Sequence, residues 1–293
     1  MAEGRIVKAL SGFYYVQSDQ GLTACKARGK FRLDGTSPLV GDLVSFSEDA
    51  GSGRIERVHE RKNWFVRPAV ANIDTLVFVA SGSNPVTDPF LIDRVSVIAS
   101  KSDCELLICV NKIDLKPADE LCAIFTQAGY PVIRTSAETG EGIDELSRML
   151  HGKTAAFTGN SGVGKSSLLN RMMPGAGLET AEVSEKLGRG RHTTRHIELF
   201  RLNECSYVAD TPGFASFEIE MMKSIEKEQL AADFIDFTPY LGRCRFNDCA
   251  HLKEPGCAVT EAVSAGAVHP SRYRSYVRLY ELCAQQNFWE KKK

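Results

Sequence analysis

Residues 159–166 read Gly-Asn-Ser-Gly-Val-Gly-Lys-Ser, and they decide how the middle of the chain is interpreted. The pattern is that of a phosphate-binding loop, G-x-x-x-x-G-K-[ST], whose backbone N–H groups surround the phosphates of a nucleoside triphosphate. Residues 153–158 predict a short buried strand before the loop, and residues 166–173 predict a helix after it. The N-terminus of that helix then faces the phosphates. We expect Lys165 to contact the β- and γ-phosphates and Ser166 to be a ligand of Mg²⁺.

Two elements nearer the N-terminus indicate that the nucleotide contains guanine. Asn111-Lys112-Ile113-Asp114 follows a predicted strand over 105–110 and resembles the N-K-x-D element of GTPases. A carboxylate there accepts hydrogen bonds from N1–H and the N2 amine of guanine. Adenine offers neither donor, so an unpaired carboxylate disfavours ATP, which leaves an ATPase as a distant alternative. Ser136-Ala137 resembles the second guanine element, whose backbone N–H contacts the base oxygen.

A third element, Asp210-Thr211-Pro212-Gly213, follows another predicted strand and resembles the D-x-x-G element of the same proteins. We expect Asp210 to hold Mg²⁺ through water and the Gly213 N–H to contact the γ-phosphate. The next residue is Phe214, where many GTPases have a Gln that orients the attacking water. Unaided hydrolysis should therefore be slow, and another polar group must orient the water.

The segment 187–195 is rich in glycine and cations and predicts a switch loop between the phosphate loop and Asp210. Its His192 is our candidate for the catalytic residue that orients water. The alternative is that His192 only lies in a solvated loop. Thr193 or Thr194 would complete the Mg²⁺ shell, and we favour Thr193.

The residues that we expect to contact GTP lie in all of these motifs. They are Asn111, Lys112, Asp114, Ser136, Ala137, Gly159, Asn160, Ser161, Gly162, Val163, Gly164, Lys165, Ser166, Ser167, Asp210 and Gly213.

The order of the motifs is unusual, because the base-reading elements precede the phosphate-reading ones. Ordinary Ras-like GTPases have the phosphate loop first and N-K-x-D late. A sheet tolerates such a change when the old termini are joined and a new break is placed in a loop. We therefore predict a circularly permuted α/β GTPase domain over residues 68–218. The segment after Gly213 then leads directly into the C-terminal module, so that GTP binding should reposition this module.

The first 67 residues predict a small barrel of the oligonucleotide-binding type. Five short strands, broken by turn residues, are expected at 5–10, 13–18, 22–27, 42–47 and 53–58. Such barrels bind nucleic acid through exposed aromatic and basic residues. The candidates are Tyr14, Tyr15, Lys26, Arg28, Lys30 and Arg32. The alternative is that the tyrosines belong to the core and the charges only solvate the surface.

Residues 219–293 predict a helical domain that binds one structural zinc ion. Cys244, Cys249, His251 and Cys257 form a C-x₄-C-x-H-x₅-C pattern, and three thiolates with one imidazole satisfy tetrahedral Zn²⁺ without an open position. Helices are expected at 258–266 and 271–287. The second interleaves arginine with tyrosine, a pattern that suits RNA contact and inward packing equally. Five further cysteines are expected to be core thiols: Cys25, Cys104, Cys109, Cys122 and Cys205.

The composition of the chain bears on its number of domains, its location and its charge distribution. The chain has 293 residues, 43% of them hydrophobic, which is enough for two or three domains with cores. It has no apolar stretch long enough to span a membrane and no apolar segment typical of a signal peptide, so we expect a cytoplasmic protein. Its cysteines should then be reduced or bind metal. We expect a monomer by default. Its net charge is positive over 1–67 and 237–293 and negative between them, which fits two ends that touch a polyanion.

Taken together, the chain resembles the circularly permuted, small-subunit-dependent GTPases of bacterial ribosome assembly. The resemblance is carried by Arg28-Gly29-Lys30, 67–74, 111–114, 135–142, 159–166, 190–194, 210–213 and 244–259. It implies a slow GTPase that acts in late maturation of the small ribosomal subunit as an assembly checkpoint and is stimulated by that subunit. It also implies that the barrel and the zinc module contact rRNA and that His192 is catalytic. Arg195 stands where relatives often have a third Thr, so the choice of Mg²⁺-binding threonine stays open. An rRNA-binding protein in which GTP only sets affinity remains the alternative.

Overall fold

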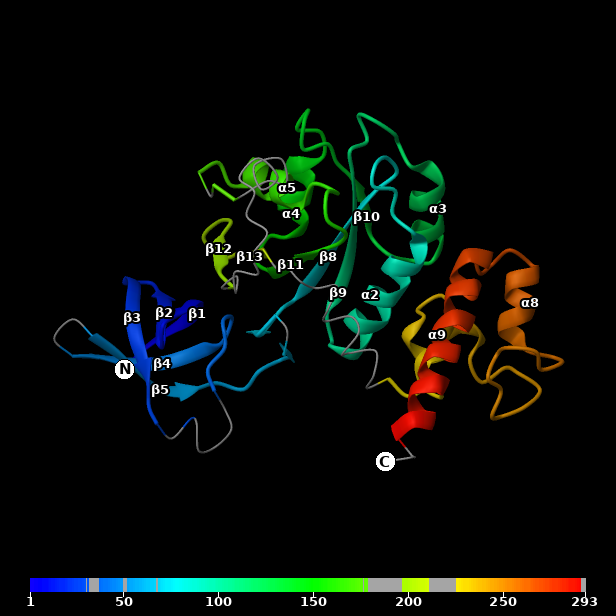
Figure 1. Cartoon of the computed structure of the whole chain (residues 1–293), viewed down its shortest axis with the longest axis horizontal. Helices are drawn as coiled ribbons and strands as arrows, with labels where there is room; N and C mark the ends of the chain where they lie inside the picture. Colours follow the sequence, from blue (N-terminus) through cyan, green and yellow to red (C-terminus); the bar gives the residue numbers. More distant parts are fainter. Residues whose placement is uncertain are drawn as a thin grey trace.

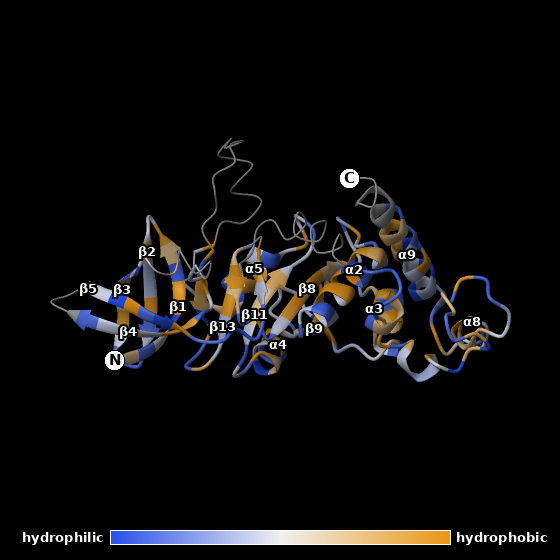
Figure 2. Ribbon diagram, turned by 90° about the horizontal axis from the view of Figure 1, so that it is seen from below, coloured by the Kyte–Doolittle hydropathy of each residue, from blue (hydrophilic) through white to orange (hydrophobic). Residues whose placement is uncertain are grey.

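The computed structural model describes residues 1–29, 31, 37–49, 52–66, 68–175, 177–178, 197–210 and 225–290. Three parts lie in a row, with a strand barrel at one end, a sheet flanked by helices in the middle and a helical module at the other end (Figure 1). The turned view shows the same row, with hydrophobic residues concentrated on the central strands (Figure 2). The predicted fold class is confirmed. The boundaries expected at 67/68 and 218/219 involve residues outside the described ones.

The N-terminal strands close into a barrel in the order β1-β2-β3-β5-β4, with β1 returning to β4. All neighbours are antiparallel except β3 and β5. Alternate side chains point inward because successive residues of a strand face opposite sides, and Ile6, Val16, Val44, Phe46 and Ile55 fill the interior. The strands are β1 (Ala2–Leu10), β2 (Phe13–Ser18), β3 (Gly21–Ala27), β4 (Leu43–Asp49) and β5 (Ser52–Val58).

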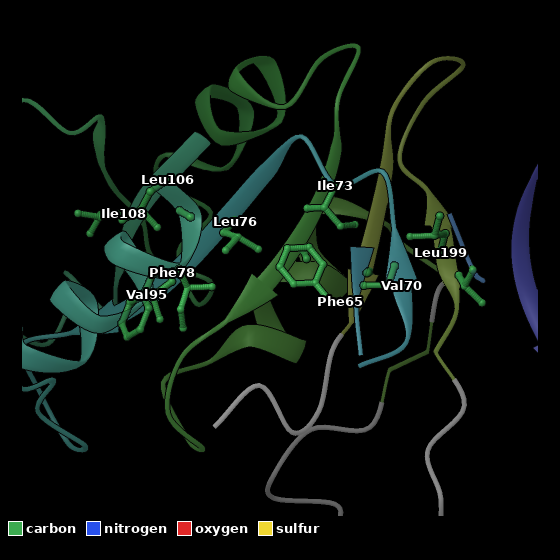
Figure 3. Packing of buried hydrophobic residues seen from close by; sticks show 14 of the residues in the cluster. Phe65, Val70, Ile73, Leu76, Phe78, Val95, Leu106, Ile108 and Leu199 are labelled. Atoms are coloured by element: carbon green, nitrogen blue, oxygen red, sulfur yellow. The ribbon is translucent and has the colours of Figure 1, made fainter. Parts of the chain in front are cut away.

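The barrel is tied to the central part by a short two-stranded sheet of β6 (Trp64–Phe65) and β7 (Val70–Ala71). Asn63 is buried beside it, where its Nδ2 donates to the carbonyls of Ile73 (2.8 Å) and Ser102 (3.0 Å) and its Oδ1 accepts from the Ile73 N–H (2.9 Å). Phe65, Val70 and Ile73 continue the buried hydrophobic cluster of the central part (Figure 3). The connection is therefore a packed interface.

The central sheet has six strands in the order β10-β9-β8-β11-β13-β12. Five strands are parallel and β12 alone runs antiparallel. Because parallel strands end at the same edge of a sheet, the loops that follow these five strands all lie at the carboxyl edge of the sheet. The strands are β8 (Thr75–Ser81), β9 (Glu105–Asn111), β10 (Val132–Arg134), β11 (Thr154–Thr158), β12 (Leu199–Arg201) and β13 (Tyr207–Asp210).

Helices cover both faces of this sheet, and β8 shows why. Its Leu76 and Phe78 belong to the cluster formed with α2 and α3, whereas Val77 and Val79 belong to the cluster formed with α4 and α5. A strand buried on both faces is hydrophobic throughout, as expected for a parallel sheet. Figure 3 shows Leu76 and Phe78 against Val95 of α2. The helices are α2 (Pro89–Lys101), α3 (Asp119–Gln127), α4 (Ile143–Met149) and α5 (Lys165–Met172).

Over residues 225–290 the C-terminal module forms two 3₁₀ turns and two helices, and it packs on α2 through α9 (Figure 1). Tyr276 is buried in its core, and the hydroxyl groups of Tyr273 and Tyr276 donate to backbone carbonyls of residues 250–252. For these two tyrosines the structure therefore decides in favour of inward packing. The elements are η1 (Leu230–Asp233), η2 (Thr238–Tyr240), α8 (Ala258–Ser264) and α9 (Pro270–Glu290).

A buried arginine joins the module to the central part. Arg272 of α9 is fully buried; its Nη1 lies 2.5 Å from Asp93 Oδ1 of α2 and its Nη2 lies 2.7 Å from Asp236 Oδ1. Its guanidinium carbon is 4.6 Å from the ring centroid of Phe234 and 5.3 Å from that of Tyr130. Burial raises the pKa of Asp93 to about 6 in spite of Arg272. The basic and aromatic pattern of α9 is thus partly a core feature.

The cysteines expected in the core differ in their burial. Cys205 is exposed in the turn between β12 and β13, so its assignment to the core was wrong, because a chain reversal leaves little room for burial. Cys25, Cys109 and Cys122 are buried and Cys104 is half-buried, as expected for core thiols.

Within the described part of the chain, no helix is long and apolar enough to cross a bilayer.

Candidate nucleotide site and metal cluster

The predicted nucleotide-binding motifs converge at the carboxyl edge of the central sheet. β9 ends at Asn111 and β13 ends at Asp210. Ser136-Ala137 follows β10, and the loop 159–166 follows β11. β11 is paired with β8 on one side and with β13 on the other, so the phosphate loop leaves the middle of the sheet. This edge is where ligands bind in open α/β sheets.

The phosphate loop passes closely over its neighbours and requires glycine at two points. Gly159 has a φ of +131°, and a Cβ there would lie 2.3 Å from the carbonyl oxygen of Val79. Gly164 has a φ of +98°, and a Cβ there would lie 2.3 Å from Asn111 Nδ2. Both positions therefore exclude a side chain on grounds of φ and of space. Lys165 begins α5, and its Nζ donates to the carbonyls of Gly159 and Asn160, each at 2.7 Å.

Asn111 connects the phosphate loop to the base-reading elements. Its side chain is almost fully buried; Nδ2 donates to the Val163 carbonyl (2.9 Å) and Oδ1 accepts from the Ala137 N–H (3.1 Å). One amide thereby fixes the spacing between three segments that are distant in sequence. This bridging role was not foreseen from the sequence, where Asn111 was assigned only by its place in the N-K-x-D motif.

Asp114 is held by the second base element. Ser136 is buried, its hydroxyl donates to Asp114 Oδ1 (2.5 Å), and its oxygen accepts from the Thr139 N–H (3.1 Å). A carboxylate oriented in this way can present an oxygen to two donors on one edge of a base. The N-K-x-D and Ser-Ala elements are thus directly hydrogen-bonded to each other.

A loop without any motif also borders the site. Lys112 has a φ of +64°, and its Nζ donates to the Asn84 carbonyl (2.8 Å) in the connection between β8 and α2. A Cβ at Gly162 would lie 3.5 Å from Pro85 of the same connection. Sequence reasoning missed this loop, because it acts through its backbone and shape, which no residue pattern signals.

Several of the predicted site residues lie outside the part of the chain that the structure describes. His192, Thr193 and Gly213 lie outside the described residues, and the structure describes only the backbone of Asp210. Ser166 lies in the first turn of α5 and Ser167 follows it. The described part of the site thus comprises the base-reading elements and the phosphate loop.

The four predicted zinc ligands come together in the C-terminal module. Their ligand atoms all lie within 4.8 Å of one another. His251 Nδ1 is 3.5 Å from Cys244 Sγ and 3.4 Å from Cys257 Sγ, and the two sulfurs are 3.9 Å apart. Zn–S bonds of about 2.3 Å and Zn–N bonds of about 2.0 Å in a tetrahedron give ligand separations of about 3.5–3.8 Å. The donor set and its spacing therefore fit a closed zinc site.

Surrounding groups support this cluster. Burial lowers the pKa of His251 and so favours the neutral imidazole, which is the form that binds metal ions. Glu254 accepts from the N–H groups of Ala250, Leu252 and Lys253 and so closes the turn between the ligands. Burial by itself would raise the pKa of Glu254, but the backbone donors outweigh it and hold this pKa below its usual value.

A mostly parallel sheet with a phosphate loop after a central strand, and base-reading motifs earlier in the chain, defines a circularly permuted P-loop GTPase. The protein is a GTP hydrolase. The sequence matches the RsgA GTPase family over residues 58–220 and the RsgA N-terminal domain over residues 3–55. The chain belongs to the RsgA GTPase family.

Similar proteins match over nearly their whole length. The small ribosomal subunit biogenesis GTPase RsgA of Alkaliphilus metalliredigens is 43% identical, over 95% of this chain and 97% of its own. Its counterpart from Caldanaerobacter subterraneus subsp. tengcongensis is 45% identical, over 94% of each chain. The crystal structure of YjeQ from Thermotoga maritima is 39% identical, with a TM-score of 0.83 over 97% of this chain and 98% of that one. YloQ, described as a circularly permuted GTPase, is 35% identical with a TM-score of 0.81, over 98% and 96%.

Proposed function

We propose that this GTPase binds the small ribosomal subunit and hydrolyses GTP to GDP and phosphate during late maturation of that subunit. In this role it acts as an assembly checkpoint whose turnover the subunit stimulates. The observation that carries the proposal is the full-length similarity, at 43–45% identity, to proteins named small ribosomal subunit biogenesis GTPases. The described site adds support, because its base-reading and phosphate-binding elements are directly bonded to each other.

The described residues divide the work of binding GTP. We assign the selection of guanine to Asp114, which Ser136 orients, and contact with the base oxygen to the Ala137 N–H, which in this structure donates to Asn111 Oδ1. The backbone of residues 159–164 surrounds the phosphates, and Lys165 turns from the loop carbonyls to the β- and γ-phosphates. Ser166 and Thr193 would hold Mg²⁺, with Asp210 acting through water; the ion supplies neutralisation of the phosphate charge.

Hydrolysis requires a group that orients water, and Phe214 cannot be that group. We assign the role to His192, and contact with the γ-phosphate to the Gly213 N–H. A site that lacks the usual Gln should be slow alone, which fits a protein whose partner accelerates it.

We assign rRNA contact to the N-terminal barrel and zinc binding to the C-terminal module. Lys26 and Arg28 are exposed on the barrel, whereas Tyr14 and Tyr15 are half-buried against its core; Lys30 and Arg32 lie outside the described residues. RNA contact through this barrel therefore depends on its cations more than on these tyrosines. The cluster of Cys244, Cys249, His251 and Cys257 would hold one structural Zn²⁺, which contributes folding energy to the module.

The decisive experiment measures GTP turnover with purified small subunits, with large subunits as the matched control, over a range of salt concentrations. We expect strong stimulation by small subunits alone, declining steeply with salt because phosphate contacts release counterions. Turnover that small subunits leave unchanged, together with GTP-dependent binding to them, would instead support the alternative, an rRNA-binding protein in which GTP only sets affinity.

A further inference from the structure

A groove with a volume of about 570 Å³ lies between the C-terminal helix and the central part. One wall is a single face of α9, where Ser271, Arg274, Ser275 and Arg278 recur at helical spacing. The opposite wall consists of the connection between β8 and α2 and of residues 116–121. α9 lies beside α2 in Figure 1. As far as the structure describes the chain, none of the residues assigned above to GTP, Mg²⁺ or zinc lines this groove.

Three cations line the groove, and all of them are exposed: Lys116 on one wall, Arg274 and Arg278 on the other. Among the described residues, no carboxylate forms an ion pair with any of the three. The two arginines lie one helical turn apart and so present their charge along the same wall.

The carboxylates of the groove are mostly engaged elsewhere. Asp119 pairs with Arg134 at 2.6 Å, and Asp88 accepts from the Phe90 N–H at 3.0 Å as the N-cap of α2. A hydrogen bond from an N–H does not cancel the charge of Asp88, so Asp88 and Glu120 remain against the three cations. The groove therefore has an excess of one positive charge, and this charge favours an anionic occupant.

The floor offers a planar surface beside this charge. The guanidinium carbon of Arg278 lies 3.8 Å from the ring centroid of Phe90, and the side chain of Phe90 is nearly buried beneath it. A guanidinium can stack on an aromatic ring with one face, and Arg278 is exposed, so its other face can receive a second planar group. Unpaired RNA bases stack on guanidinium planes as they do on aromatic rings.

We propose that this groove binds one unpaired nucleotide of an RNA strand, with the base on the exposed face of Arg278 and the phosphate between Arg274 and Lys116. The volume is that of a site for one small ligand, for which about 300–1,000 Å³ is usual. An acidic peptide would pair with the edges of these cations but would leave the face of the Arg278 guanidinium uncovered, whereas a base would stack on that face, so RNA is favoured. The inference rests on the proposed function, which supplies RNA as the partner.

The test uses the full-length protein and a fluorescein-labelled hexauridylate that contains 4-thiouridine. We expect photo-cross-links to peptides that contain residues 86–90 or 271–278. In anisotropy titrations, Lys116→Glu/Arg274→Glu should weaken binding about tenfold, because two phosphate contacts are reversed in charge. Arg148→Glu, an exposed arginine on α4 remote from the groove, is the matched control and should leave groove cross-links unchanged.

A second variant separates stacking from charge. Arg278→Lys keeps the charge and removes the planar group, so we expect about fivefold weaker binding of the hexauridylate, with thermal melting used to verify the fold. Cross-links confined to the barrel, or wild-type affinity of Arg278→Lys, overturn the proposal. Displacement of the hexauridylate by equimolar oligoglutamate overturns it in favour of an acidic peptide, and displacement by equimolar UMP overturns it in favour of a free nucleotide.

Small-subunit pelleting with the same proteins tells the two proposals apart. A wild-type protein that cross-links in the groove but does not pellet with small subunits contradicts the proposed function and supports the groove. Wild-type pelleting combined with an absence of groove cross-links contradicts the groove alone.

Discussion

Replacing Arg272 with methionine tests whether a buried charge holds the C-terminal module on the central part. Methionine keeps much of the hydrophobic length of the side chain and removes the guanidinium. In the wild type this group is fully buried between Asp93 of α2 and Asp236, at 2.5 and 2.7 Å. The variant leaves both carboxylates without their cation, and Asp93 is already buried with its Oδ2 unpaired.

The expected cost follows from that burial. Removing one partner of a buried ion pair costs about 3–5 kcal/mol, because the remaining charge stays desolvated. A loss of about 4 kcal/mol changes an equilibrium constant by about 10³-fold. Part of this loss is recovered when Asp93 takes up a proton, since burial already raises its pKa to about 6. We therefore expect a loss of about 3 kcal/mol at pH 7.5 and a smaller loss at pH 5.5.

Urea unfolding measured by far-UV circular dichroism, together with hydrogen exchange of α9 amides, provides the assay. Arg274→Met is the matched control, since it makes the same chemical change two residues away at an exposed position, and it should stay within about 0.5 kcal/mol of wild type. Arg272→Met/Asp93→Asn/Asp236→Asn should regain much of the loss, because no unpaired charge remains buried. A loss below 1 kcal/mol for Arg272→Met, or no recovery in the triple variant, would refute the reasoning.

Three further substitutions test the nucleotide site. Asn111→Ala leaves the Val163 carbonyl and the Ala137 N–H without their partner, and each unpaired group costs about 1–3 kcal/mol of free energy. Titration with a fluorescent GTP analogue should therefore show an affinity at least about tenfold lower than that of the wild type. An affinity within threefold of wild type contradicts the bridging role. Asp114→Asn should prefer xanthine over guanine nucleotides by about 10²-fold in competition binding, and continued preference for GTP would exclude Asp114 as the base-reading group. His192→Ala should bind GTP almost normally but lower single-turnover hydrolysis about 10²-fold; full turnover would remove His192 from catalysis.

Much of the fold could be predicted because its signals are local. The strands before residues 111 and 159 are hydrophobic runs that end in motif residues, and their predicted bounds differ from the observed ones by one residue. The clustering of the four candidate zinc ligands could be predicted because their spacing is short, so that one loop can bring them together. Local patterns of this kind need no knowledge of the rest of the chain.

The parts that could not be predicted depend on distant contacts. Arg272 and Arg278 belong to the same interleaved pattern of arginine and tyrosine, yet one is fully buried and the other is exposed. The difference arises because Asp93, 179 residues earlier in the chain, lies opposite Arg272. The bond from Lys112 to the Asn84 carbonyl is equally invisible in the sequence, because the acceptor is a backbone group.

The same contacts limit how GTP can move the C-terminal module. α2 follows the connection whose Asn84 carbonyl accepts from Lys112, and further along α2 Asp93 pairs with Arg272. Ser100 at its other end donates to Asp233 of the module (2.9 Å). Coupling between sites amounts to about 1–3 kcal/mol, which is less than the cost of breaking the Arg272 cluster.

The module should therefore move together with α2 and not separate from it when GTP replaces GDP. A spin-label distance between α2 and α9 should stay constant, while the distance from either helix to the barrel changes. The small-angle scattering profile should also differ between GDP and a GTP analogue. A changed α2–α9 distance would show that the module detaches, and equal profiles with all distances unchanged would show that it does not respond to the nucleotide. If the expected pattern is found, the permuted chain order and the buried arginine make α2 part of the switch.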